Sequence, residues 1–143
     1  MNASAATAGA AAWSPARIYL VASGVFLVVS ALLGFAVNSS FPATPDAVES
    51  AGSGHILGIF ETNGLHNLTA MISGAIALGF AVKPEWARTG AFFKGVMYVA
   101  VTVSIAVWGP ETFKFASNGA DQVVHGALGV AGLGAALATP RRP

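Results

Sequence analysis

The chain has 143 residues and no cysteine, and 55% of its residues are apolar while 9% are charged; about a quarter of residues are charged in ordinary soluble domains. The net charge of +1 excludes the broad cationic surface that nucleic-acid binding requires, and the lack of cysteine excludes disulfides, thiolate nucleophiles and cysteine-based metal sites. Since one membrane-crossing helix takes about 20 residues, this length and the mean hydropathy of +0.67 predict an all-α integral membrane protein, a four-helix bundle.

Apolar runs separated by helix breakers divide the chain into tails and spans. We expect disorder in the tail of small and polar residues before the first span, and a loop rich in proline and serine follows that span. Proline ends the second span at Lys83-Pro84, where a tight loop follows, and Gly109-Pro110 ends the third. The predicted organisation is a disordered tail at 1–16, spans at 17–37, 63–82, 89–108 and 120–138, a long loop at 38–62, and a basic tail at 139–143.

The distribution of charge predicts how the spans are oriented. Six of the seven basic residues fall at one end of the predicted bundle, and five of the six acidic residues fall at the other. Positively charged connections stay in the cytoplasm. We therefore expect a multi-pass protein of the bacterial plasma (inner) membrane, with both termini cytoplasmic and the 38–62 loop facing outward.

Two stretches of the chain resemble each other. FETNGLHNLTAMISGAIALG at 60–79 aligns without a gap with FASNGADQVVHGALGVAGLG at 115–134. The shared features include a Phe-x-[Thr/Ser]-Asn-Gly start and later glycines at matching positions. We interpret spans two and four as copies of one unit, so that the bundle consists of two helix pairs related as a parallel internal repeat.

Small residues form one stripe on each of the two repeated spans. Helical spacing places a histidine near the outer end of each stripe and small residues below it, the arrangement that lets membrane helices approach closely. We expect these stripes to meet along the inner seam of the bundle. They consist of His66, Ala70, Ser73 and Ala77 in span two and His125, Gly129, Gly132 and Ala136 in span four.

The candidate site residues gather at the predicted outer ends of spans two and four. A titratable side chain inside a membrane is costly unless it is paired or hydrated, so His66 and His125 are candidates by default. Asp121 lies one turn before His125 on the same face, close enough to accept its hydrogen bond. Neutral partners at the same level complete the cluster, namely Asn63, Asn67 and Asn118.

Three interpretations of this cluster are open. A haem b between His66 and His125 would make an electron-transfer module, although Lys114 is the one basic residue on the outer side that could meet the haem propionates. A divalent metal could bind His66, His125, Asp121 and Glu61, but no familiar ligand spacing supports this. The third interpretation, which we favour, is a structural polar cluster that holds spans two and four in register, with about 1 kcal/mol from each contact.

Other polar residues have simpler expected roles. His55 lies in the long loop, where we expect it to be solvated, and Lys94 is expected to extend to the inner surface from about one turn inside span three. The chain contains no Gly-rich phosphate loop, nucleophile elbow, Ser-His-Asp set or paired-carboxylate site. We therefore expect that the protein is not an enzyme.

The chain resembles a family of small bacterial four-helix membrane proteins catalogued only as a domain of unknown function. The resemblance covers about residues 17–138. It rests on His66-Asn67 in span two and on Ala120-Asp121-Gln122-Val123-Val124-His125 in span four. Ala70 departs from the family pattern, which has a second histidine there. The resemblance implies four helices and an unassigned activity.

The sequence favours a protein that acts by association. Small-residue stripes and short loops suggest an accessory or stabilising subunit of a larger membrane complex, or a homo-oligomer, whose partners are the lipid bilayer and other membrane subunits. The haem- or metal-binding electron-transfer module is the alternative. A small transporter or channel ranks third, because we expect no broken helix and no buried charge near the middle of a span.

Overall fold

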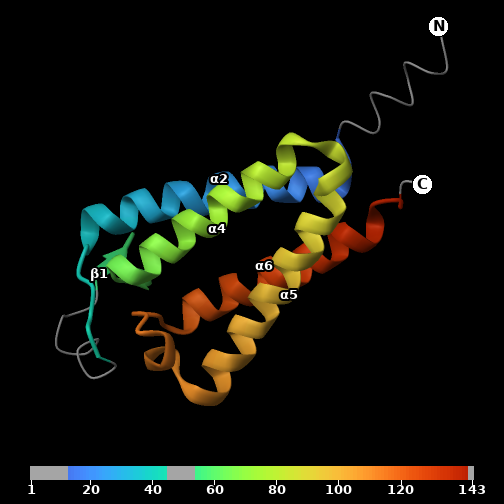
Figure 1. The fold of residues 1–143 in the computed structure, drawn as a ribbon. Coiled ribbons are helices and arrows are strands. Elements are labelled where there is room, and N and C mark those ends of the chain that lie inside the picture. The colour runs from blue at the N-terminus through green and yellow to red at the C-terminus, as the bar shows by residue number, and fades with distance from the viewer. Residues whose placement is uncertain (1–12, 45–53, 142–143) are drawn as a thin grey trace, which may run out of the picture.

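The structure is a computed structural model that describes residues 13–44 and 54–141. The predicted all-α four-helix architecture is confirmed (Figure 1). Residues 1–12 of the tail predicted at 1–16 and residues 142–143 of the basic tail lie outside the described residues. The elements in chain order are α2 (Pro15–Val37), β1 (Gly54–Ile56), β2 (Phe60–Thr62), α4 (Gly64–Val82), α5 (Pro84–Trp108), the 3₁₀ helix η1 (Pro110–Phe113) and α6 (Gly119–Ala138).

Proline sets the start of two helices. α2 begins at Pro15, two residues before the predicted span, because the side chain of Ser14 caps it. α5 begins at Pro84, so the loop expected before residue 89 is helical, and Lys83 alone separates α4 from α5. Proline cannot continue a helix because it lacks an N–H, and it suits a helix start for the same reason, since the first N–H groups have no partner inside the helix.

The region predicted as a loop at 38–62 contains a small antiparallel hairpin. β1 pairs with β2, and Leu57 and Gly58 turn the chain with positive φ values of 54° and 72°. His55, which was expected to be solvated, faces Glu61 in this register, with its Nε2 3.6 Å from a carboxylate oxygen of Glu61. Each strand has only three residues, too few for an alternating pattern to predict them.

Three of the described helices, α2, α4 and α5, are long and apolar enough to cross a membrane. This is the composition of a membrane protein. α6 has 20 residues, enough to span, but Asp121, Gln122 and His125 in its first two turns lower its hydropathy. Its crossing of the membrane stays a prediction.

The helices form two antiparallel pairs, α2 with α4 and α5 with α6 (Figure 1). A Cβ on Gly24 of α2 would lie 3.0 Å from the carbonyl oxygen of Gly74 in α4, and one on Gly95 of α5 would lie 3.0 Å from that of Gly129 in α6. Gly74 and Gly129 are equivalent in the predicted repeat. Each pair therefore has a close backbone approach at the same repeat position, where glycine lets the two helices come together.

In each pair, an arginine near the start of the first helix binds a backbone carbonyl near the end of the second helix. Arg17 donates from Nε to the carbonyl of Ala81 at 2.9 Å, and Arg88 donates from Nε to the carbonyl of Ala136 at 3.1 Å. Ala81 and Ala136 are again equivalent in the repeat, and both lie in the last turn of their helices. Carbonyls there have no partner within the helix, and a nearby cation is stabilised by the helix dipole.

The predicted seam between spans two and four is wrong over the middle of the two stripes, which faces other helices, while the histidines at the outer ends of the stripes contact each other. On α6, a Cβ on Gly132 would lie 3.0 Å from the carbonyl oxygen of Ala91 in α5. On α4, Ser73 lies 3.2 Å from the hydroxyl of Tyr98, also in α5, while Gly74 beside the stripe contacts α2. Helical spacing identifies a face of small residues but not which neighbour packs on it.

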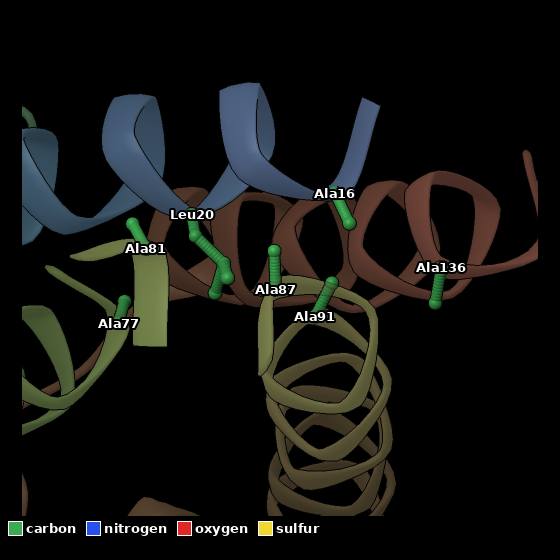
Figure 2. Close-up of a cluster of buried hydrophobic side chains, with 7 residues drawn as sticks. All are labelled: Ala16, Leu20, Ala77, Ala81, Ala87, Ala91 and Ala136. Carbon is green, nitrogen blue, oxygen red and sulfur yellow. The ribbon is translucent and has the colours of Figure 1, made fainter. Parts of the chain in front are cut away.

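A buried cluster of mostly small side chains lies near the end where Lys83 joins α4 to α5, the Lys83 end. Six alanines and Leu20 from all four helices form this cluster (Figure 2). Towards the other end, which carries the β1–β2 hairpin and is called the hairpin end, the two pairs separate (Figure 1). The buried cluster consists of Ala16, Leu20, Ala77, Ala81, Ala87, Ala91 and Ala136.

Candidate functional site

The predicted site residues lie together at the hairpin end, around the first turns of α4 and α6. Four of the six are buried. Because buried polar groups need hydrogen-bond partners, the bonds that each residue makes indicate its role. The hairpin-end cluster comprises Asn63, His66, Asn67, Asn118, Asp121 and His125.

Two asparagines begin the repeated helices. The Oδ1 of Asn63 accepts from the backbone N–H of His66 at 2.9 Å and so caps α4. The Oδ1 of Asn118 caps α6 by accepting from the backbone N–H groups of Ala120 and Asp121, at 2.9 and 3.2 Å. Asparagine is a preferred N-cap because its side chain satisfies N–H groups that the helix leaves without a partner.

The other end of each asparagine side chain binds the opposite helix pair. Asn63 donates from Nδ2 to the carbonyl of Lys114 at 2.9 Å, and Asn118 donates from Nδ2 to the carbonyl of Ile59 at 2.7 Å. Lys114 is the repeat equivalent of Ile59, as Asn118 is of Asn63. Each half therefore binds the same position of the other half, which is the reciprocal contact of a two-fold interface.

His66 and Asp121 are also repeat equivalents, each three residues after its cap. The ring of His66 donates from Nδ1 to the carbonyl of Ala116 at 2.9 Å. Asp121 accepts a backbone hydrogen bond from Glu61, the equivalent of Ala116. Its Oδ2 also accepts from the backbone N–H of Asn118 at 2.9 Å, which completes a capping box. The ring of His66 donates to the second half, and the carboxylate of Asp121 accepts from the first half. A donor and an acceptor therefore occupy equivalent positions in the two halves of the repeat.

His125 is buried but does not make the expected hydrogen bond, which was to be donated by its ring and accepted by Asp121. The carboxylate of Asp121 turns to the helix cap instead, and Nδ1 of His125 has no hydrogen-bond partner among the described residues. The ring contacts His66 and Tyr98, with centroids 5.7 Å away in each case. Ala70, where the related family has a second histidine, is the repeat equivalent of His125.

Asn67 fixes the first helix pair to the hairpin. Its Oδ1 accepts from the hydroxyl of Thr62, and its Nδ2 donates to the carbonyl of Asn38 at 2.9 Å. The equivalent bond in the second pair runs from Nε2 of Gln122 to Oγ of Ser117 at 2.9 Å. Both side chains therefore fold back to the residue one position before the cap.

Lys94 was expected at the surface, but it is buried near the middle of α5 with 7% exposed. Its Nζ donates to Oγ of Ser73 at 3.2 Å and lies 4.9 Å from the ring centre of Tyr98. The expectation failed because α5 begins at Pro84 and not near residue 89, which moves Lys94 deeper into the helix. The chain therefore has a buried basic group near the middle of a span, where the sequence predicted no buried charge.

The two histidines do not fit a haem held between them. Such a haem requires the porphyrin between the two imidazoles, but the rings of His66 and His125 contact each other edge to face. His66 also stacks on Phe115, with centroids 5.4 Å apart. Lys114, which was expected to meet the haem propionates, instead donates from Nζ to the carbonyl of Ala43 at 2.8 Å.

The arrangement does not favour the metal alternative either. In residues 13–44 and 54–141, no group of three or more His, Asp or Glu side chains could hold a metal ion. Glu61, the fourth ligand in that alternative, is paired with His55 across the hairpin. Asp121 is engaged by backbone N–H groups.

Comparison with protein families matches residues 17–138 to the family described as a domain of unknown function (DUF4383). This confirms the resemblance seen in the sequence. No curated protein and no solved structure matches the chain.

Proposed function

The chain belongs to the DUF4383 family, whose description assigns no activity, and we propose that it is a non-enzymatic membrane protein that acts by association, as an accessory or stabilising subunit or as a homo-oligomer. The residues available for chemistry support this, since most of the hairpin-end cluster is engaged in caps and reciprocal bonds. Such bonds hold a fold together and leave few groups free to act on a substrate.

One exposed face of α6 carries the association proposal. Its residues follow alternating steps of four and three, the spacing of a helix that packs along another helix. Val123, Val130 and Leu137 are 73%, 69% and 77% exposed, and a Cβ on Gly134 would meet nothing within 4 Å. Since small residues let membrane helices approach closely, the face of Val123, Ala127, Val130, Gly134 and Leu137 suits a neighbouring helix.

The comparison with α4 favours α6 as the contact helix. The equivalent face of α4 has Leu68 and Ile72 where α6 has Val123 and Ala127, so it is bulkier in its first half, where α6 offers a smaller contact surface. α4 is also long and apolar enough to cross a membrane, whereas the mean hydropathy of α6 is too low to place it in that group. A helix of lower hydropathy gains more from contact with protein.

Photo-crosslinking tests this proposal, because the native chain has no cysteine. Gly134→Cys is labelled with benzophenone maleimide in native membranes and irradiated. Adducts with a second copy would establish a homo-oligomer, and adducts with another membrane protein would establish an accessory subunit. Gly79→Cys is the matched control, since Gly79 is the exposed repeat equivalent on α4. Lipid adducts alone at both positions would contradict association through α6.

We further propose that the protein lies in the bacterial plasma membrane with its termini in the cytoplasm. Arg17, Lys83, Arg88 and Arg141 lie at the Lys83 end, which the positive-inside rule assigns to the cytoplasm. An impermeant maleimide applied to spheroplasts should label Leu57→Cys at the exposed hairpin tip and not the exposed Glu85→Cys. The reverse labelling would invert the orientation.

A further inference from the structure

A cavity lies at the hairpin end, between the two helix pairs and beneath the β1–β2 hairpin. Its volume is about 380 Å³, within the range of small-molecule sites. α2 forms an apolar wall, and the hairpin with the first turns of α4 and α6 forms a polar end. This polar end contains Glu61, His66, Asp121 and His125.

The cavity opens along the side of the bundle. Val25, Phe26, Val29 and Leu33 of α2 line it, and each is about half exposed at 46–50%. α2 is apolar enough to cross a membrane, so in a bilayer this side borders lipid. A molecule dissolved in the bilayer can therefore reach the cavity without passing through water.

His125 presents an unsatisfied polar group to this cavity. The residue lines the cavity with only 8% of its surface exposed, and its Nδ1 has no hydrogen-bond partner among the described residues. A buried nitrogen without a partner costs roughly 1–3 kcal/mol. A polar atom of a bound molecule, or a water, would satisfy it.

The charges and rings of the lining restrict the chemistry of the occupant. Glu61 and Asp121 line the polar end, and no lysine or arginine does, so an anionic head group would be repelled. Phe26 and Phe60 line the cavity with the two histidine rings. Aromatic walls favour a flat ring, which can stack or pack edge to face against them.

We propose that this cavity binds an uncharged, lipid-soluble molecule with a flat oxygen-bearing ring, of the quinone or quinol class, whose oxygen hydrogen-bonds to Nδ1 of His125. The apolar part of the molecule lies along α2. His125 and the aromatic lining bind the ring, and the two carboxylates exclude anionic lipids. The cavity is separate from the exposed face of α6, so a negative result for one proposal does not contradict the other.

Calorimetry on the full chain in phosphatidylcholine nanodiscs tests this proposal with decyl-benzoquinone as the probe. We expect saturable binding to one site, beyond the uptake by protein-free nanodiscs. His125→Phe keeps an aromatic ring but removes the nitrogen, and it should weaken binding at least tenfold. Ala70→Leu should also weaken binding at least tenfold, because Ala70 lines the cavity and a larger side chain would fill it.

Ala75→Leu is the matched control, being the same change on the same helix at an exposed position outside the lining. It should bind the probe as the native chain does. Uptake no greater than that of protein-free nanodiscs, or equal binding by all variants, would overturn the proposal and leave water as the occupant. Equally tight binding of decanoate would overturn the exclusion of anions, and equally tight binding of decanol would overturn recognition of the ring.

Discussion

At the scale of single residues, Asn63 and Asn118 show how one side chain joins local and long-range structure. The carbonyl oxygen of each amide caps its own helix, and the NH₂ group binds the backbone of the other helix pair. A serine hydroxyl could also cap the helix, but serine has no NH₂ group that could at the same time donate to the other helix pair. The need for both contacts explains asparagine at the two equivalent positions.

Substitutions at Asn63 should separate its two roles. Asn63→Ser keeps an acceptor for the cap but removes the bond to Lys114, and should lower the free energy of unfolding by about 1 kcal/mol. Asn63→Ala removes both and should cost about 2 kcal/mol in total. Denaturant unfolding in mixed micelles, followed by circular dichroism, measures both values. Equal stability of the two variants would mean that the bond between the halves contributes nothing, and the same changes at Asn118 provide the replicate.

Lys94 shows the cost of burying a charge within the bundle. Its ammonium is held by the hydroxyl of Ser73 and the ring of Tyr98, and no carboxylate of the described residues lies within salt-bridge distance. A neutral hydroxyl and an aromatic face compensate a buried cation less well than an opposite charge does. Such a residue weakens the fold, which marks it for functional study.

Two substitutions in this contact should change stability in opposite directions. Lys94→Met fills a similar volume without charge and should raise the free energy of unfolding by roughly 1–3 kcal/mol. Ser73→Ala leaves the ammonium without its hydroxyl and should lower that free energy by roughly 1–3 kcal/mol. Unfolding in the same micelles distinguishes the two, and a destabilised Lys94→Met would show that the cation contributes to the fold.

At the scale of helices, two glycines of α4 have opposite surroundings although both lie within the same apolar run. Gly74 contacts the backbone of Gly24, whereas a Cβ on Gly79 would meet nothing within 4 Å. Their equivalents on α6 repeat the contrast, since Gly129 contacts α5 and Gly134 is open. Within each repeated helix, therefore, Gly74 and Gly129 take part in close helix contact and Gly79 and Gly134 do not.

Alanine substitutions should separate the two kinds of glycine. Gly74→Ala would place its Cβ 2.8 Å from the carbonyl oxygen of Gly24, so the helices must move apart at a cost of roughly 1–3 kcal/mol. Gly79→Ala should raise stability by about 0.5–1 kcal/mol, because alanine is the better helix former. Thermal unfolding of both variants measures the difference. If Gly74→Ala were as stable as Gly79→Ala, the close contact would be irrelevant to stability.

At the scale of the whole molecule, the two ends of the bundle are built differently. Small side chains from all four helices form a buried cluster near the Lys83 end (Figure 2), whereas at the hairpin end a cavity of about 380 Å³ lies between the helix pairs. Reciprocal hydrogen bonds connect the pairs at that open end in place of apolar packing. Apolar packing therefore joins the pairs at the Lys83 end, together with a hydrogen bond from the backbone N–H of Ala16 to Oγ1 of Thr139 at 2.9 Å, and hydrogen bonds join them at the hairpin end.

The same enlargement should therefore have different effects at the two ends. Ala91→Leu adds bulk to the fully buried cluster and should cost roughly 1–3 kcal/mol through overpacking. Ala70→Leu enters the cavity and should leave stability within about 0.5 kcal/mol of the native chain. Unfolding curves of the two variants test this, and a similar loss in both would contradict an open hairpin end.

The residues of the candidate site were predictable from the sequence, but their partners were not. A titratable side chain inside a membrane costs free energy unless it is paired or hydrated. His66, Asp121 and His125 could therefore be identified as candidates from their places in apolar runs. The bond expected between Asp121 and His125 failed because a backbone N–H competes for the carboxylate at a helix start. Lys94 was misplaced because proline can start a helix as well as end one.

The sequence by itself determined the class of protein, the four helices, most of their ends and the repeat. These depend on local signals, namely apolar runs, proline, glycine and asparagine caps, which act within a few residues. Only the tertiary structure decided which faces pack together, that Lys94 is buried, and that the halves bind reciprocally around a cavity. In a chain this apolar, hydropathy does not distinguish a face that meets lipid from one that meets a helix, so the partners depend on contacts between distant residues.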